Sequence, residues 1–402
     1  MDGRCLDWWV FARDAISNNL ALMQRRLELD AARGFMLVWM TLTHLPTIAS
    51  PLVNQPFGFV SAAEGFILLS ALFTGRIYFR LAERDGYPRM RSRVWMRTLR
   101  LYLYHAAVLS FAFLIETRVA AHGNRPGLHN LLDFYFAVGP RRAILDAVFL
   151  IYRPPLLDIL PMYIFFLLLT PLVLSAAPRW GWKLILAASF AVWLAAQFGL
   201  RAAAYNLLVR TLNLQIPLSA MGSFDLWAWQ FLWLIGLYCG VRWARDDFPV
   251  ETWARRFIIP AALIVPVLLV LRYAVGRSID LGDLEVDFDK WHLGGVRLID
   301  FAAISILLIR FQSALRPLVV RPLVLLGQAS LQVFCAHLLF CFVGLTLMGT
   351  ADRVSGWQQI ALLAATFSGL LLTAKLFAKS EARIQGDGGR PTVLAQVSAE
   401  AD

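Results

Sequence analysis

Arg33, His44 and Glu64 are the residues whose types and spacing best suit chemistry inside an apolar part of this chain. Arg33 and His44 lie eleven positions apart, close to three helical turns. In a helix both side chains then share one face, about 16 Å apart along the axis. An arginine at the membrane surface can hold an anion, and a histidine deeper in can move a proton. There are competing interpretations for both residues. Arg33 could be a charge anchor paired with Asp30, and His44 could be a residue of helix packing.

Glu64 opens the next apolar segment and reaches a depth similar to that of His44. A carboxylate that accepts from one imidazole nitrogen fixes the tautomer and makes the other nitrogen a better base. We therefore predict a catalytic pair of His44 and Glu64. Two alternatives stay open, that Glu64 is protonated or that it caps a broken helix. Ser61 and Tyr163 are candidate donors to an oxyanion.

Other polar side chains open or interrupt later apolar segments. Asp158, Tyr163, Trp229 and Gln230 lie where acids and rings could meet a sugar, although an interfacial aromatic belt is the alternative. Ser330 and His337 share a further segment, and His337 is a second base candidate or a packing histidine. We predict that one group of residues contacts the sugar or an oxyanion: Ser61, Asp158, Tyr163, Trp229 and Gln230. Ser330 and His337 are second-tier candidates for the site.

The composition predicts an all-α membrane protein. Of the 402 residues, 59% are hydrophobic and 16% charged, and the mean hydropathy is +0.61, which excludes a soluble globule, a disordered chain and a disulfide scaffold. The four cysteines form no CxxC pair, so we expect no metal site. No Walker loop, GxSxG or HExxH motif is present.

The hydropathy pattern predicts a helical bundle with ten spans. These are about 34–53, 57–79, 98–117, 156–177, 183–201, 223–244, 256–275, 298–314, 322–349 and 358–378. The ninth is long, and a tilt or break is expected near Gly327. With the N-terminus in the cytoplasm, most of the 38 Lys and Arg fall on the cytoplasmic side, so we expect both termini inside. The expected division is a possibly amphipathic N-terminal arm (1–33), a membrane domain (34–378) and a cytoplasmic tail (379–402).

Several runs resemble the OpgC family. Arg33 and His44 fit the R-x10-H signature of related acyltransferase-3 type membrane enzymes. Closer matches are Asp30-Ala-Ala-Arg33-Gly34, His44-Leu-Pro46, the run from Phe57 through Ser61-Ala-Ala-Glu64-Gly-Phe, and Gly327-Gln-Ala-Ser330 continuing to His337. The resemblance covers about residues 28–340. One departure is Ser70-Ala71, where the related acyltransferases usually carry Ser-Gly.

The resemblance implies a membrane acyltransferase of ten to eleven helices in the bacterial inner membrane. It would transfer a succinyl group from cytoplasmic succinyl-CoA to glucose hydroxyls of osmoregulated periplasmic glucans. His44 would be the base and Arg33 a donor contact. No permanently bound cofactor is expected. The basic inner segment suits the donor phosphates, so we assign donor binding to Asp30, Arg33, Arg76, Arg93 and Arg97. A route in which His44 itself carries the acyl group stays open.

A transporter for an anionic metabolite or sugar is the alternative function, because it could use the same intramembrane Arg, His and Glu. The basic inner segment and the absence of inverted repeats favour a nucleotide-like donor instead. The expected partners are succinyl-CoA, the periplasmic glucan and the lipid bilayer, and not a nucleic acid. A homo-oligomer or a complex with glucan-synthesis proteins is left open.

Overall fold

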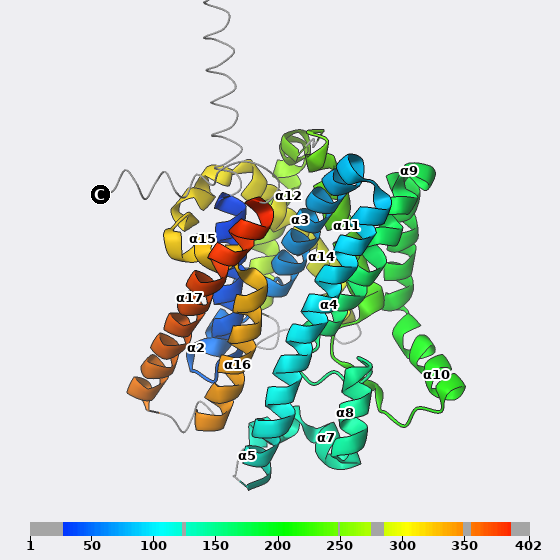
Figure 1. The fold of residues 1–402 in the computed structure, drawn as a ribbon. Helices are drawn as coiled ribbons and strands as arrows, with labels where there is room; N and C mark the ends of the chain where they lie inside the picture. Colours follow the sequence, from blue (N-terminus) through cyan, green and yellow to red (C-terminus); the bar gives the residue numbers. More distant parts are fainter. Residues whose placement is uncertain (1–26, 123–125, 248–249, 275–284, 349–354, 387–402) are drawn as a thin grey trace, which may run out of the picture.

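The computed structural model describes residues 27–122, 126–247, 250–274, 285–348 and 355–386. All regular structure in these ranges is helical (Figure 1). The predicted N-terminal arm lies outside the described residues up to position 26, and the predicted tail lies outside them from position 387.

Seven helices are long and apolar enough to cross a membrane, and eight if a bent pair counts as one span. The seven are Ala62–Asp85, Tyr87–Val119, Ile159–Gln197, Leu218–Ala244, Ala254–Ala274, Ser330–Met348 and Gly356–Phe377. The bent pair is α14 (Gly295–Arg310) with a 3-10 helix (Gln312–Leu318), at 86° to each other. The chain is therefore a helical protein of multi-pass type, and the count of ten stays a prediction.

Four of the predicted spans differ in form from a single straight helix. The first is a helix over residues 27–44 that carries Glu28, Asp30 and Arg33, followed by the short α2 (Ala49–Val53). The fourth and fifth fall on one element, α9 (Ile159–Gln197), which is divided at Gly181 by a positive φ of 76°. The ninth is divided at Ala329 into α15 (Arg321–Gln328) and α16 (Ser330–Met348), so the break expected near Gly327 is confirmed.

Local sequence explains where the site-bearing helices begin. α3 (Ala62–Asp85) starts with a capping box, in which Ser61 and Glu64 exchange hydrogen bonds with the first-turn backbone. α4 (Tyr87–Phe111) follows Gly86, whose φ of 84° turns the chain, and has Pro88 in its first turn. α11 (Leu226–Ala244) is capped by Asp225, which accepts from the Trp227 N–H.

Glycines allow two close helix crossings that fix the site. A methyl group at Gly34 would overlap the Leu323 carbonyl, and one at Gly327 would overlap the Asp30 carbonyl, so the first helix and α15 touch backbone to backbone. α11 meets α3 in the same way through Gly240, which faces the Leu72 carbonyl.

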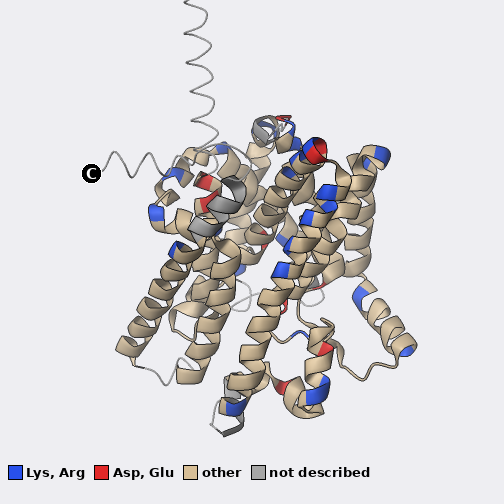
Figure 2. Cartoon of the chain, viewed as in Figure 1, with Lys and Arg blue, Asp and Glu red and all other residues tan. Residues whose placement is uncertain are grey.

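The shorter helices gather at the end of the bundle away from the α3–α4 turn (Figure 1). They are α5 (Thr117–His122), α6 (Pro126–Leu131), α7 (Asp133–Val138), α8 (Pro140–Val148) and α10 (Leu200–Leu212). The remaining helices are α12 (Val250–Ala274), α13 (Glu285–Phe288) and α17 (Gly356–Gly386). Most Lys and Arg of the described residues lie toward the α3–α4 end (Figure 2).

Candidate active site

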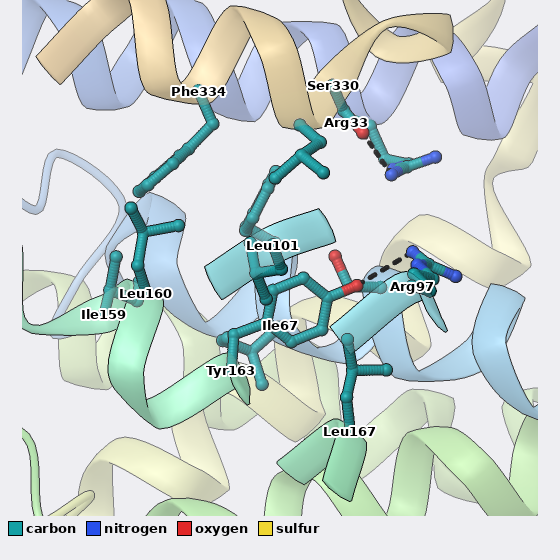
Figure 3. A pocket seen from close by; sticks show the side chains of 13 residues that line it. Arg33, Ile67, Arg97, Leu101, Ile159, Leu160, Tyr163, Leu167, Ser330 and Phe334 are labelled. Atoms are coloured by element: carbon teal, nitrogen blue, oxygen red, sulfur yellow. Dashed lines mark hydrogen bonds between the residues drawn. The ribbon is translucent and has the colours of Figure 1, made fainter. Parts of the chain in front are cut away.

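Two arginines mark one end of an internal cavity. Arg33, on the first helix, donates to the hydroxyl of Ser330 at the start of α16, and its guanidinium lies 5.0 Å from the centre of the Phe73 ring. Arg97, on α4, donates to the Tyr163 hydroxyl at 2.9 Å. Figure 3 shows both guanidinium groups on the same side of the cavity. Four predicted site residues, Arg33, Arg97, Tyr163 and Ser330, are thereby brought together.

The rest of the cavity wall is mainly apolar. The cavity is narrow, with a volume of about 20 Å³, and its apolar lining consists of Phe66, Ile67, Leu101, Ile159, Leu160, Leu167, Leu331 and Phe334. These side chains come from α3, α4, α9 and α16 and extend away from the two arginines (Figure 3). A cationic end with an apolar body suits a ligand that has an anionic head and a long thin arm.

His44 and His337 form a hydrogen-bonded pair two helical turns beyond Ser330 on α16. His44 Nδ1 lies 3.3 Å from His337 Nε2, and the rings stack with centroids 5.6 Å apart. His337 Nδ1 lies 2.6 Å from the Phe334 carbonyl oxygen, which can only accept, so this nitrogen carries the proton. His337 Nε2 is then an acceptor, and the proton between the rings belongs to His44 Nδ1.

This arrangement leaves the lone pair of His44 on Nε2, as a general base requires. The helix carrying Arg33 and His44 therefore runs along α16, because Arg33 meets Ser330 and His44 meets His337. The prediction that Arg33 and His44 share a helix face is confirmed.

Phe334 lies between the cavity and the histidine pair. Its ring stacks on Phe66 at 5.5 Å and meets the edge of His337 at 4.8 Å. Both phenylalanines also line the cavity. The two rings thus close the cavity at the end nearest the histidines, one helical turn from each of Ser330 and His337.

Glu64 does not contact His44, so the predicted pair of His44 and Glu64 is wrong; the observed partner of His44 is His337. Glu64 Oε1 accepts from Arg297 Nε in an ion pair whose two side chains are fully buried. Glu64 Oε2 accepts from the Ser61 backbone at 3.0 Å and from its hydroxyl at 2.7 Å. The capping alternative for Glu64 is the one observed. The Ser61 hydroxyl is committed to Glu64, which argues against its expected part as an oxyanion donor.

Three of the predicted acceptor residues, Asp158, Trp229 and Gln230, form internal hydrogen bonds instead of lining the cavity. Asp158 accepts from the Ser223 N–H at 2.9 Å, and the Trp229 indole donates to the Trp291 carbonyl at 3.1 Å. Gln230 exchanges hydrogen bonds with Ser189 on α9. These contacts hold α11 and the segment before α14 against α9.

Three predicted donor residues, Asp30, Arg76 and Arg93, do not line the cavity. Arg76 is buried, with its guanidinium 3.4 Å from the centre of the Trp243 ring, and Arg93 is exposed on α4. Asp30 is half-buried one turn before Arg33, and its backbone carbonyl meets Gly327.

His44, His337 and Cys341 offer three ligand atoms within 4.8 Å of one another. A metal could be held there in principle, since His and Cys are its common ligands. The imidazoles of His44 and His337 also hydrogen-bond to each other.

Sequence reasoning missed Arg297, Lys290, Cys341 and Phe334. Arg297 and Lys290 had a usable signal, because they stand beside an apolar span on the side that is otherwise poor in basic residues. Phe334 and Cys341 had none, since they look like ordinary apolar residues of a span.

Comparison with known proteins supports the resemblance stated above. The family model described as OpgC protein matches residues 25–382. The chain belongs to the OpgC family. Membership implies, at the level of the family, a part in succinylating osmoregulated periplasmic glucans. No curated protein and no solved structure matches the chain.

Proposed function

We propose that this OpgC family member is an inner-membrane O-acyltransferase that moves a succinyl group from cytoplasmic succinyl-CoA to a glucose hydroxyl of periplasmic glucan. The observation that carries the proposal is the cavity, which is cationic at one end, has apolar walls and ends at Phe66 and Phe334, with the pair of His44 and His337 on the far side of Phe334. Membership of the OpgC family supports the choice of succinyl as the acyl group and of periplasmic glucan as the acceptor.

The donor fits the cavity by its chemistry. Phosphates of coenzyme A are placed against Arg33 and Arg97, and exposed arginines such as Arg93 add to the local positive potential. The pantetheine arm follows the apolar walls toward Phe334. Ser330 and Tyr163 hold the two guanidinium groups in place through the hydrogen bonds described above. Arg76 contributes charge from behind the cavity wall.

The transfer needs one base. His44 Nε2 takes the proton of a sugar hydroxyl, whose oxygen forms a bond to the thioester carbonyl carbon. The tetrahedral intermediate then breaks the C–S bond, and the leaving thiolate of coenzyme A takes the proton from His44. His337 orients His44 by accepting from Nδ1–H, and this hydrogen bond strengthens as His44 becomes positively charged.

The orientation follows from charge. The end of the bundle that carries the α3–α4 turn is rich in Lys and Arg (Figure 2), which supports a cytoplasmic location for it. The donor then enters from the cytoplasm at Arg33 and Arg97, and the acceptor reaches His44 from the opposite side.

The test is succinyl transfer by the purified protein in detergent or nanodiscs, with labelled succinyl-CoA and unsubstituted glucan. The wild type is expected to label the glucan, and His44→Ala to bind coenzyme A but transfer at least about a hundredfold more slowly. Undiminished transfer by His44→Ala would overturn the mechanism, and a failure of the wild type to bind coenzyme A would overturn the function. Release of coenzyme A without glucan, in an amount equal to the enzyme, would favour an acyl-histidine route.

A further inference from the structure

Lys290 carries a charge that no described side chain pairs. It lies half-buried in the turn between α13 and α14, with Nζ 5.0 Å from the centre of the Trp291 ring and 5.9 Å from that of Phe224. Among the described residues it has no hydrogen bond or ion pair. Burial lowers the pKa of Lys290, and the nearby negative charge of Glu64 partly opposes this. An ammonium held between aromatic rings and left unpaired is suited to binding a ligand.

Arg297 is a second cation, near enough to Lys290 for the two charges to interact. The side chain is fully buried, and its Nε donates to Glu64. Nη1 and Nη2 have no hydrogen-bond partner among the described residues. A buried guanidinium normally has all its donors satisfied, so this edge is short of acceptors. Two parallel N–H groups are the geometry that receives a carboxylate.

The neighbouring acids do not neutralise these donors. Asp158 binds the Ser223 N–H, and Asp300 binds the Phe59 N–H at 2.7 Å. Within the described residues, neither acid forms an ion pair with Lys290 or Arg297. The Glu64 carboxylate is shared between Arg297 and Ser61. Among the described residues, the Arg297 Nη1 and Nη2 groups and the Lys290 ammonium therefore still lack an acceptor. Leaving such charged donors without a partner costs free energy inside a membrane protein.

Arg297 and Arg33 meet α3 at different levels, because Arg297 pairs with Glu64 in its first turn, whereas Arg33 lies over Phe73, nine positions later. The Lys290 charge interacts electrostatically with His44 and with Glu64. On α3, Glu64 lies one helical turn before Ile67, which lines the cavity. A group carried past His44 by the donor would thus approach Lys290 and Arg297.

We propose that Lys290, supported by Arg297, binds the terminal carboxylate of a dicarboxylic acyl group and so selects the succinyl donor. The inference rests on the proposed function. A succinyl group carries its carboxylate two methylene groups beyond the thioester carbonyl. With the carbonyl at His44, that carboxylate points toward the two cations. Neutral sugar hydroxyls do not require a cation, so the acceptor does not explain the unpaired charge.

The experiment compares succinyl-CoA with acetyl-CoA as donors to the same glucan, using kcat/KM for each. Lys290→Met should lower kcat/KM for succinyl-CoA by about tenfold to a hundredfold, the range for losing one charge-assisted contact. The value for acetyl-CoA should change by less than about threefold, because acetyl has no carboxylate to lose. Lys290→Arg keeps the charge and should retain the preference for succinyl-CoA.

Lys375→Met is the matched control, since Lys375 is exposed on α17, and it should leave both donors unaffected. Equal losses for the two donors in Lys290→Met would overturn the inference and assign Lys290 to structure or to the acceptor. Unchanged succinyl transfer would overturn it as well. Either result leaves the proposed function standing, whereas a wild type that uses neither donor would remove the function itself.

Discussion

At the scale of single residues, the orienting partner of His44 is another histidine. A neutral imidazole acceptor supports the positive charge on His44 less than a carboxylate would, but it fixes the same tautomer. The sequence made His44 a candidate through its spacing from Arg33. It could not reveal His337 as the partner, because 293 positions separate the two residues.

Replacing His337 tests this pairing. His337→Leu removes the acceptor for His44 Nδ1–H and should lower kcat by about tenfold to a hundredfold, with KM for succinyl-CoA unchanged. His337→Gln keeps an acceptor near the position of Nε2 and should retain most of the activity. The double variant His44→Ala/His337→Leu should be no slower than His44→Ala alone. Additive losses would show that the two histidines act independently.

Glu64 should matter for stability more than for the pH dependence of transfer. Glu64→Gln leaves the buried Arg297 without its carboxylate, and breaking a buried ion pair typically costs about 3–5 kcal/mol. Thermal unfolding of the purified variant should therefore show a clear fall in Tm. Arg97→Gln, which alters a half-buried arginine outside this pair, should change Tm much less. A Glu64→Gln protein with wild-type Tm and a hundredfold loss of kcat would restore Glu64 as a catalytic residue.

At the scale of helices, the contact between the first helix and α15 positions the donor end. Gly327→Ala would push the Asp30 backbone away and move Arg33 from Ser330. We expect a loss of about 1–3 kcal/mol in stability, as for other overpacked contacts, together with weaker coenzyme A binding measured by calorimetry. Gly356→Ala is the control, because a methyl group there meets no atom within 4 Å. Equal behaviour of the two variants would contradict the close contact.

The segment before α14 should respond to pH through Asp289 and His292. Their hydrogen bond raises the pKa of His292, and the same contact lowers the pKa of Asp289 against the effect of burial. Because the pKa of His292 is raised in the folded protein, the pair adds stability below about pH 6.5. This stability is lost as the pH rises through the pKa of the folded state. The lowered pKa of Asp289 gives stability that is lost as pH falls below about 3.8.

The prediction from these two groups is a Tm difference between wild type and His292→Gln. It should be largest between about pH 4 and 6.5 and should shrink in alkaline buffer. Differential scanning fluorimetry across pH 4–9 measures it. A difference that grows with pH would contradict the assigned pairing.

The pattern of apolar residues predicted most helices, but only one of the breaks within them. The break between α15 and α16 was visible at Gly327, because glycine weakens a helix. The division of α9 at Gly181 lay between two predicted spans, where Pro178 also stands. The ion pair of Glu64 and Arg297 joins helices 233 positions apart, and no local pattern encodes such a contact. Ala71 departs from the family run, yet the close approach of α3 and α11 survives because Gly236 faces it.

At the scale of the whole molecule, a net charge of +11 is distributed unevenly along the bundle. The proposed orientation places the α3–α4 turn in the cytoplasm and α8 on the other side. Single cysteines introduced at Ser92 and Arg141, both exposed, should differ in intact cells. An impermeant maleimide should label position 141 and should label position 92 only after the membrane is opened. Equal labelling of both would place donor and acceptor on one side.

The stacked rings of Phe66 and Phe334 have a consequence for the cell's energy supply. In the proposed mechanism one substrate enters from each face, and the two openings meet at His44, which would move a proton. If both openings were open together, protons would run down their gradient through the protein. Aromatic rings packed without polar atoms exclude the chain of waters that such conduction needs. In the proposed mechanism, the stacked rings of Phe66 and Phe334 would therefore insulate the donor cavity from the histidine pair.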